Sequence, residues 1–436
     1  MKVYSKSGET IYQGSCLTIM QDLDHNSIDA IVTDPPYGLT ANKKGGSGDA
    51  SLNLKHPAGR SRITTGGGFM GQKWDAGVPC VEFWQESLRV AKPGAHLLAF
   101  GGTRTFHRLT CAIEDAGWEI RDCIMWVYGS GFPKSHDVNK AIDKESGAER
   151  ERIRGVRSAA GSDTYAYDAW SKEFKDSVLS SDAITTEAQQ WSGWGTALKP
   201  AWEPIIVSRK PLDGTVAQNV LQHGTGAINI DACRVEHVTV DNGSLATNPH
   251  LRDHINAGNG SHIFSTESDR RVVTPHELGR FPANLIHDGS DEVVELFPEQ
   301  SGGGHPTRRF ADKTRNTYGG FTGNECPPGI GPSSGNASRF FYCAKESDRD
   351  ILPAKEFPLF GESHAAVKNT HPTVKPVELM RYLCRLVTPP GGLILDPFAG
   401  SGTTLVAAKL EGFASIGIEL NPDYVKLILG RLGQEF

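Results

Sequence analysis

The strongest constraint on the fold is a strand, a glycine-rich turn, a helix and a second strand in close succession late in the chain. The apolar run from Leu393 to Leu395 is followed by DPFAGSGTT (396–404), by a predicted helix from Thr403 to about Leu410, and by an apolar run from Ala414 to Leu420. Two parallel strands joined by a helix form the repeating unit of α/β sheets. Glycines directly after a strand also let backbone N–H groups approach a ligand.

An acidic residue, Glu419, closes this unit about twenty positions after Asp396. A carboxylate at this place can accept hydrogen bonds from both hydroxyls of a ribose. The segment has neither the GxGxxG pattern of dinucleotide sites nor the lysine of a phosphate-binding loop. The pattern therefore favours a nucleoside-type ligand over a dinucleotide or a nucleoside triphosphate.

A second α/β part occupies the beginning of the chain. The apolar run from Ile28 to Val32 predicts a buried strand, which leads directly into Asp34, Pro35, Pro36 and Tyr37. Further elements are expected as helices at 81–90 and 104–116 and as strands at 96–100 and 119–128. Residues 39–73, rich in Gly, Ser and Lys, are expected to form a long loop. This alternation predicts a mostly parallel sheet with helices on both faces.

The alternation stops near residue 130 and resumes at HPTVKP (371–376), where a helix with one apolar face is expected to follow Pro376. We therefore predict one doubly wound α/β sheet built from residues 1–130 and 365–436. Residues 131–364 are predicted to be a second domain inserted between its halves. Three residues of this domain could contact a ligand, but packing inside the domain is the favoured prediction for each of them: Trp191, Trp194 and His287.

Composition places the chain among ordinary globular proteins. Hydrophobic residues make up 38% and charged residues 22%, and no stretch approaches the roughly 18 uncharged apolar residues of a membrane span. The first residues show no apolar signal-peptide core, so a cytoplasmic location is expected. The eight cysteines are scattered without a CxxC pair, which indicates neither a disulfide framework nor a zinc site, and no metal is expected.

The net charge of −6 counts against a nucleic-acid-binding surface, because such surfaces are usually basic. Two local clusters have the opposite sign. One lies within residues 150–157, and the other contains Arg308 and Arg309. Because a charge run is often only a solvated face, these clusters are candidates for phosphate contacts and nothing more.

The tetrapeptide Asp34-Pro35-Pro36-Tyr37 suits the methylation of an amine conjugated to an aromatic ring. Such an amine is a poor nucleophile because its lone pair is delocalised. The Asp34 carboxylate and the Pro35 carbonyl can both accept hydrogen bonds from the NH₂ group, which frees the lone pair for attack. Tyr37 offers a flat face to a base extruded from a duplex. The same four residues are also good turn formers, so the tetrapeptide alone does not decide the matter.

Together, the motifs resemble those of the amino-group DNA methyltransferases, in the permuted beta class where the catalytic tetrapeptide precedes the cofactor motif. The matching segments are TDPPYGL, NTHPTVKPVELM, LDPFAGSGTT and IGIEL, while KPGAHLLAFGG and GFPKSHDV resemble phage and prophage members. The resemblance implies a circularly permuted, Rossmann-like methyltransferase sheet, S-adenosylmethionine as cofactor and double-stranded DNA as substrate. It also implies that residues 131–364 recognise the target sequence.

The resemblance further implies roles for single residues. Asp34, Pro35, Pro36 and Tyr37 would be catalytic. His371, Thr373 and Lys375 would border the methionine end of the cofactor, and Glu419 would hold its ribose. The remaining cofactor-binding positions are Asp396, Phe398, Ala399, Gly400, Ser401, Gly402 and Thr403.

One departure from the family pattern is visible near the start of the chain. Family members often carry Gly-Asp where this chain has Gly14-Ser15, and Ser15 cannot accept a hydrogen bond from the cofactor adenine as a carboxylate would.

Several alternatives stay open at this point. Asp in the first position of the tetrapeptide favours N6 of adenine, whereas Ser is more usual for N4 of cytosine. A C5-cytosine methyltransferase would need a nucleophilic cysteine, and Pro79-Cys80 lacks the companion Glu-Asn-Val segment. A non-catalytic DNA-binding protein on the same fold is disfavoured by the intact tetrapeptide. The recognition sequence, a homodimer and a cognate restriction endonuclease are all left undecided by the sequence.

Overall fold

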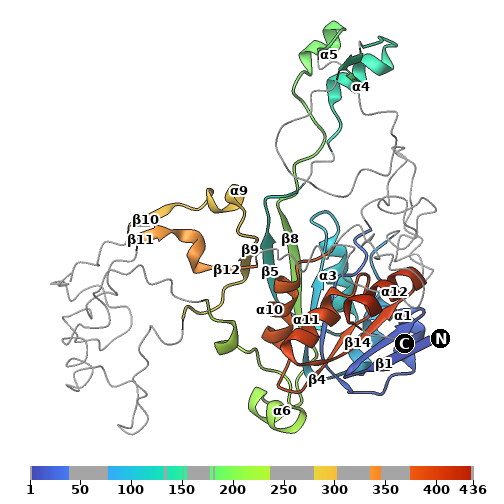
Figure 1. Ribbon diagram of the computed structural model, residues 1–436, viewed down its shortest axis with the longest axis vertical. Coiled ribbons are helices and arrows are strands. Elements are labelled where there is room, and N and C mark those ends of the chain that lie inside the picture. Colours follow the sequence, from blue (N-terminus) through green and yellow to red (C-terminus); the bar gives the residue numbers. More distant parts are fainter. Residues whose placement is uncertain are drawn as a thin grey trace, which may run out of the picture.

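The computed structural model describes residues 2–38, 77–131, 135–150, 152–154, 177–179, 182–235, 279–301, 334–344 and 374–433. The loop expected at residues 39–73 lies outside these described residues. Within them, the central element is a ten-stranded sheet in the order β1-β2-β14-β13-β3-β4-β8-β5-β9-β12 (Figure 1). Its strands are β1 Lys2–Lys6, β2 Glu9–Gln13, β3 Ile28–Thr33, β4 Ala91–Phe100, β5 Glu119–Val127, β8 Trp202–Arg209, β9 Leu285–His287, β12 Tyr342–Cys343, β13 Leu393–Asp396 and β14 Ala414–Glu419.

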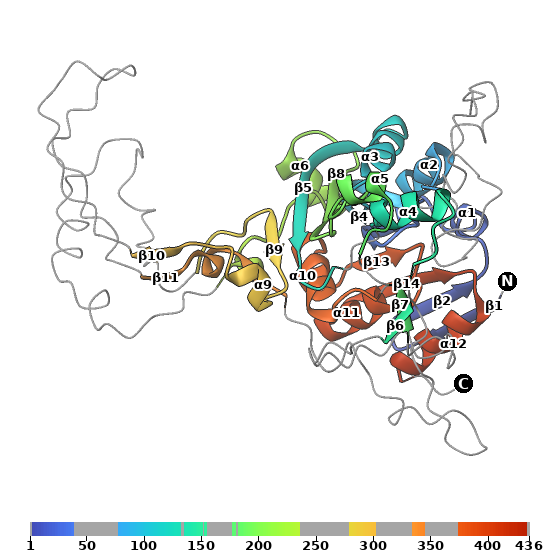
Figure 2. The same ribbon diagram turned by 90° about the horizontal axis from the view of Figure 1, so that it is seen from above.

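Helices cover both faces of this sheet, as the alternation predicted (Figure 2). One face carries α1 (Cys16–Gln21), α2 (Val81–Val90) and α3 (Phe106–Asp115), and the other carries α10 (Val377–Val387) and α11 (Thr403–Glu411). The apolar stripe of α10, which includes Leu379 and Leu383, is fully buried. All six residues of β3 are buried too, as expected for a strand covered on both sides. The predicted doubly wound α/β class is thus confirmed.

The two halves of the sheet meet at β3 and β13. These strands are parallel neighbours with Ile31 opposite Leu395, although they lie at opposite ends of the chain. From β13 the chain crosses through α11 to β14 on one side, and from β3 it crosses through α2 to β4 on the other side. Ligands of open α/β sheets bind where such crossovers diverge, at the carboxyl ends of the strands. The permuted arrangement therefore places Asp34 and Asp396 at one switch point.

The predicted domain boundary at residue 131 is wrong for three segments. Strands β8, β9 and β12 lie in the stretch expected to be an insertion, yet they belong to the central sheet. β8 runs antiparallel between β4 and β5, with Ile205 opposite Phe100 and Trp202 opposite Val127. The apolar run 204–207 is its buried centre. By contrast, the short apolar run 227–230 forms no strand.

The remaining described elements flank those named above, and one of them, α12 (Pro422–Arg431), packs on the sheet through Val425 and Ile428 against Ile11 of β2. A small unit formed by α4 (Val138–Glu145) and α5 (Thr186–Gln190), here called the α4–α5 unit, stands apart from the sheet beyond the end of β5 (Figure 1). The other described elements are β6 Arg152–Arg154, β7 Ser177–Leu179, α6 Val216–His223, α9 Asp291–Val294, β10 Glu299–Ser301, β11 Ser334–Asn336 and α12 Pro422–Arg431.

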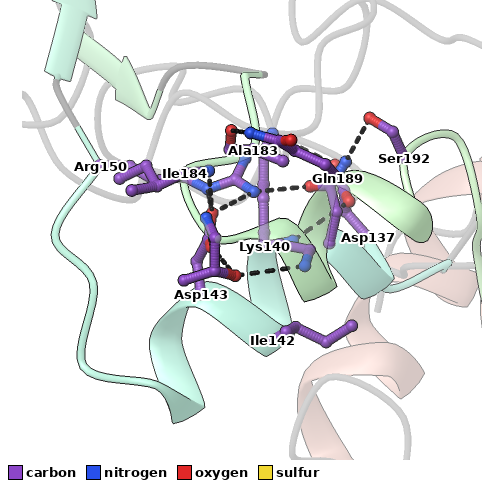
Figure 3. Close-up of polar contacts among 12 residues, drawn as sticks. Asp137, Lys140, Ile142, Asp143, Arg150, Ala183, Ile184, Gln189 and Ser192 are labelled. Atoms are coloured by element: carbon purple, nitrogen blue, oxygen red, sulfur yellow. Dashed lines mark hydrogen bonds and ion pairs between the residues drawn. The ribbon is translucent and has the colours of Figure 1, made fainter.

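Buried polar contacts hold the α4–α5 unit together (Figure 3). Asp143 accepts hydrogen bonds from the backbone N–H groups of Ile184 and Thr185, both at 3.0 Å, and pairs with Arg150 at 2.7 Å. Burial opposes its ionisation, but these hydrogen bonds hold the pKa of Asp143 well below its ordinary value. The cluster joins the two helices, although some forty residues separate Asp143 from Thr185 along the chain.

Trp191 and Trp194 lie at the end of α5, and the prediction that they pack inside a domain is wrong. Their rings meet edge to face at 5.1 Å, but Trp191 is 44% exposed and Trp194 is 60% exposed. The α4–α5 unit is too small to cover both indoles, so they cover each other. His287 is buried, as expected, but in β9 of the central sheet and not inside a separate domain.

Candidate active site

Asp34 directly follows β3 and forms an ion pair with Lys375. The Nζ atom of Lys375 donates to Oδ2 of Asp34 at 2.6 Å, and only 7% of the lysine side chain is exposed. The other carboxylate oxygen, Oδ1, is buried and has no hydrogen-bond partner among the described residues. A buried acceptor without a partner is costly and therefore marks a place for a ligand that donates a hydrogen bond.

Glu203 also lies in this site, although it was not predicted from the sequence. It lies at the start of β8 and accepts hydrogen bonds from the hydroxyls of Tyr37 at 2.9 Å and Tyr128 at 3.4 Å. Its Oε2 atom is also 3.4 Å from Nζ of Lys375. Because β8 is antiparallel to β4, its first residues lie at the edge where β3 and β4 end. The only local signal for Glu203 is an acidic residue next to the apolar run 204–207. That signal does not assign Glu203 to the site unless the direction of the strand is known.

Tyr37 is held at both its backbone and its hydroxyl. Its carbonyl oxygen accepts a hydrogen bond from Thr105 Oγ1 at 2.6 Å, while its hydroxyl donates to Glu203. Burial, together with the nearby acids Asp34 and Glu203, raises the pKa of Tyr37 well above its ordinary value, so the hydroxyl stays protonated. Between Asp34 and Tyr37, Pro35 is buried and Pro36 is half-buried. The tetrapeptide is therefore a fixed element rather than an exposed turn.

Asp396 links the two motifs. Its Oδ1 atom accepts hydrogen bonds from Thr33 Oγ1 at 2.7 Å and from the backbone N–H of Phe398 at 3.1 Å. Burial raises the pKa of Asp396 to about 6. Since Thr33 is the last residue of β3 and immediately precedes Asp34, this hydrogen bond joins the glycine-rich turn to the strand that leads into the tetrapeptide Asp34-Pro35-Pro36-Tyr37.

The glycine-rich turn wraps around Glu419. The carboxylate accepts backbone hydrogen bonds from Gly400 at 2.9 Å and Asn421 at 2.7 Å. Gly402 has a φ of +79°, and a Cβ there would lie 2.9 Å from Ile428, so only glycine fits without strain. Burial raises the pKa of Glu419 to about 7. The predicted ribose acid is thus beside the turn, with backbone contacts that fix its orientation.

The other predicted residues of the turn differ in what they face. The ring of Phe398 packs against Phe83 with centroids 4.8 Å apart. Ser401 and Thr403 are buried, and Arg431 donates to the carbonyl of Ser401 and to the hydroxyl of Thr403 at 2.8 and 2.9 Å. These two hydroxyls therefore stabilise the turn from within. Ala399 is buried as well.

The residues present fit the predicted cofactor. Oε2 of Glu419 accepts a hydrogen bond from the N–H of Gly400 and Oε1 accepts one from the N–H of Asn421, and a carboxylate oxygen can accept more than one hydrogen bond, so the carboxylate can also hold the ribose hydroxyls. Phe398 supplies an apolar surface beside the turn. At Gly14, the backbone N–H donates to the carbonyl of Glu419 at 3.0 Å, and Ser15 is the N-cap residue of α1 but makes no capping hydrogen bond with its side chain. His371, Thr373, Arg308 and Arg309 lie outside the described residues.

Cys80 does not resemble an activated nucleophile. It precedes α2, and burial raises the pKa of its thiol above the ordinary value. A reactive cysteine requires the opposite shift. This observation agrees with the sequence-based argument against a C5-cytosine enzyme.

Comparison with known proteins identifies the class. A family model described as DNA methylase, covering N6 and N4 enzymes, matches residues 28–430, and the chain belongs to this family. Type II methyltransferase M.HindIII of Haemophilus influenzae is 23% identical over 98% of this chain and 96% of that protein. DNA adenine methyltransferase YhdJ of Escherichia coli is 47% identical over 62 residues, which are 14% of this chain and 21% of that protein.

Solved structures give a weaker likeness. The M1.HpyAVI–SAM complex has a TM-score of 0.35 at 14% identity and covers 97% of this chain and 98% of its own. The cytosine-N4-specific PvuII DNA methyltransferase has a TM-score of 0.40 at 13% identity, covering 98% and 87%. The family nevertheless confirms the predicted class and its cofactor, S-adenosylmethionine. Within the described ranges, no helix is long and apolar enough to cross a membrane.

Proposed function

We propose that this DNA methyltransferase transfers a methyl group to N6 of adenine in double-stranded DNA. The observation that carries the proposal is the buried Oδ1 atom of Asp34, which has no partner among the described residues. It offers an acceptor to an N–H donor at the switch point of the sheet. Aspartate in the first position of the tetrapeptide favours adenine over cytosine, and the DNA adenine methyltransferase YhdJ shares 47% identity over its matching segment.

The chemistry of the site follows from these side chains. Oδ1 of Asp34 and the carbonyl of Pro35 would accept hydrogen bonds from the two N–H groups of the amine, which favours a tetrahedral nitrogen whose lone pair is no longer delocalised into the ring. S-adenosylmethionine supplies an electrophilic methyl group on a sulfonium. The nitrogen would gain this methyl group as the methyl–sulfur bond breaks and S-adenosylhomocysteine leaves, and it would lose one proton, which Asp34 is placed to accept. Glu419 would hold the ribose of the cofactor, and Phe398, Gly400 and Gly402 would line its pocket.

Target recognition is proposed for those parts of residues 131–364 that lie outside the sheet. β8 is excluded, because it supplies Glu203 to the site. Arg308 and Arg309 remain candidates for phosphate contacts. Neutralising both should weaken DNA binding and reduce its salt dependence by about one unit of slope for each lost contact.

The base is tested by analysing the nucleosides of methylated DNA. Plasmid DNA from a methylation-deficient host would be incubated with the protein and S-adenosylmethionine, digested, and separated by mass spectrometry. We expect N6-methyladenine with the wild type and none with Asp34→Ala. N4-methylcytosine as the product would refute the proposed base.

The matched control for this variant is Asp29→Ala. Asp29 lies near the start of β3, at the opposite end of the strand from Asp34, and also pairs with a lysine, Lys92, at 2.6 Å. Equal losses of activity in the two variants would mean that damage to β3 explains the effect of Asp34→Ala.

A further inference from the structure

The charged groups around Asp34 form one connected cluster centred on Glu203. This carboxylate contacts Lys375, Tyr37 and Tyr128, and Lys375 in turn contacts Asp34. The five residues of the cluster come from four separate segments of the chain, because Asp34 and Tyr37 belong to the same tetrapeptide. A side chain that joins this many groups beside a catalytic carboxylate can set the geometry of the whole site.

Lys375 is the element that needs Glu203 most. Its ammonium is almost fully buried and lies 5.0 Å from the ring centroid of Phe100 and 5.3 Å from that of Tyr37. Burial disfavours the charged form, yet Asp34 and Glu203 together raise the pKa of Lys375 above its ordinary value. Two carboxylates therefore share one ammonium.

This charge arrangement affects the acceptor strength of Asp34. An ammonium that paired with Asp34 alone would neutralise it and withdraw electron density from the oxygen that faces the target amine. Glu203 shares the ammonium and so leaves Asp34 a stronger acceptor. The ion pair also fixes Oδ2, so that Oδ1 is the oxygen left for the target.

We infer that Glu203 is a positioning residue for methyl transfer: it holds Lys375 against Asp34 and fixes the ring of Tyr37 through its hydroxyl. The inference rests on the proposed function, in which Asp34 accepts the target amine. In this inference Glu203 acts through Lys375 and Tyr37 and not by contact with the amine or the cofactor. Its effect should therefore fall on the rate of methyl transfer and not on cofactor binding.

The test is Glu203→Gln, which preserves shape and removes the charge. Single-turnover transfer of tritiated methyl groups to DNA should slow about 10- to 100-fold, the range expected when reacting groups are misplaced by a fraction of an ångström to 1 Å. The dissociation constant for S-adenosylhomocysteine should stay within about threefold. Glu203→Asp, which keeps the charge, should recover part of the rate.

The pH profile separates positioning from a purely structural role. Without Glu203 the pKa of Lys375 falls, so the alkaline limb of the rate profile should move to lower pH in Glu203→Gln and much less in Glu203→Asp. Glu119→Gln is the matched control. Glu119 on β5 pairs with Arg209 on β8 at 2.6 Å, at the end of these two strands that lies away from Glu203. Its rate and profile should match the wild type.

Each outcome bears on the inference. A wild-type rate in Glu203→Gln would overturn it, and so would a slow rate with an unshifted pH profile and no recovery in Glu203→Asp. The assay counts methyl groups on any base, so a product of N4-methylcytosine would refute the proposed base and leave the role of Glu203 standing. Equal rates for the wild type and Glu203→Gln would refute the role of Glu203 and leave the proposed base standing.

Discussion

Cofactor affinity should increase with pH between about 5.5 and 8, because Glu419 must be ionised to accept two ribose hydroxyls. Burial raises the pKa of this carboxyl from 4.5 to about 7. With that pKa, about a tenth of the molecules carry the carboxylate at pH 6 and about nine tenths at pH 8. When only a fraction of the protein is competent to bind, the apparent dissociation constant is the intrinsic constant divided by that fraction. S-adenosylhomocysteine should thus bind about tenfold more weakly at pH 6 than at pH 8.

Isothermal titration calorimetry at constant ionic strength measures this directly. Glu419→Gln is the control, because any titration of the ligand or of Asp396 affects both proteins equally. The variant should bind more weakly at pH 8 by on the order of 1.5–3 kcal/mol, the loss expected for a charged acceptor. It should also lose the tenfold pH effect. A wild-type dissociation constant that is constant with pH, or an identical pH dependence in both proteins, would refute the assignment.

Three further predictions concern stability and rate. Because the pKa of Glu419 is raised, the folded state binds more protons than the unfolded state between pH 4.5 and 7. The stability that the protonated Glu419 contributes is therefore lost as the pH rises through this window. By pH 8 the loss amounts to about 3 kcal/mol. In thermal melts, Glu419→Gln should therefore show a smaller difference in Tm between pH 5 and pH 8. Asp34→Ala should slow methyl transfer more than about a hundredfold, while calorimetry finds cofactor affinity nearly unchanged. Asp143→Asn removes a carboxylate from buried Arg150, so limited proteolysis should cut the α4–α5 unit sooner, without loss of cofactor binding.

The chemistry-bearing motifs were predictable because their residues are local in sequence. Strand, glycine turn and acid follow one another from Leu393 to Glu419, and the tetrapeptide directly follows a buried strand, so periodicity and turn chemistry sufficed. The helix predicted at 81–90 has those bounds in the structure. Elements of this kind are determined mainly by their own residues.

Glu203 and the exposed pair Trp191 and Trp194 were not predictable in this way. Whether Glu203 joins the site depends on the direction of β8, which is set by its pairing with β4 and β5 and not by its own residues. The exposure of the two tryptophans depends on how little else packs in the α4–α5 unit. Long-range packing determines both the place of Glu203 and the exposure of the tryptophans, so local sequence patterns do not predict them.

The interleaved order of the sheet has a consequence during synthesis. β2 and β3 follow each other in the chain, yet β14 and β13 lie between them in the sheet, and both of these strands are made after every other described strand. Until then, β2 and β3 each have an unpaired edge, which is a template for aggregation. A fragment that ends before Leu393 should therefore collect in inclusion bodies. Supplying residues 374–436 as a separate polypeptide during expression should restore solubility, because it provides the two missing central strands.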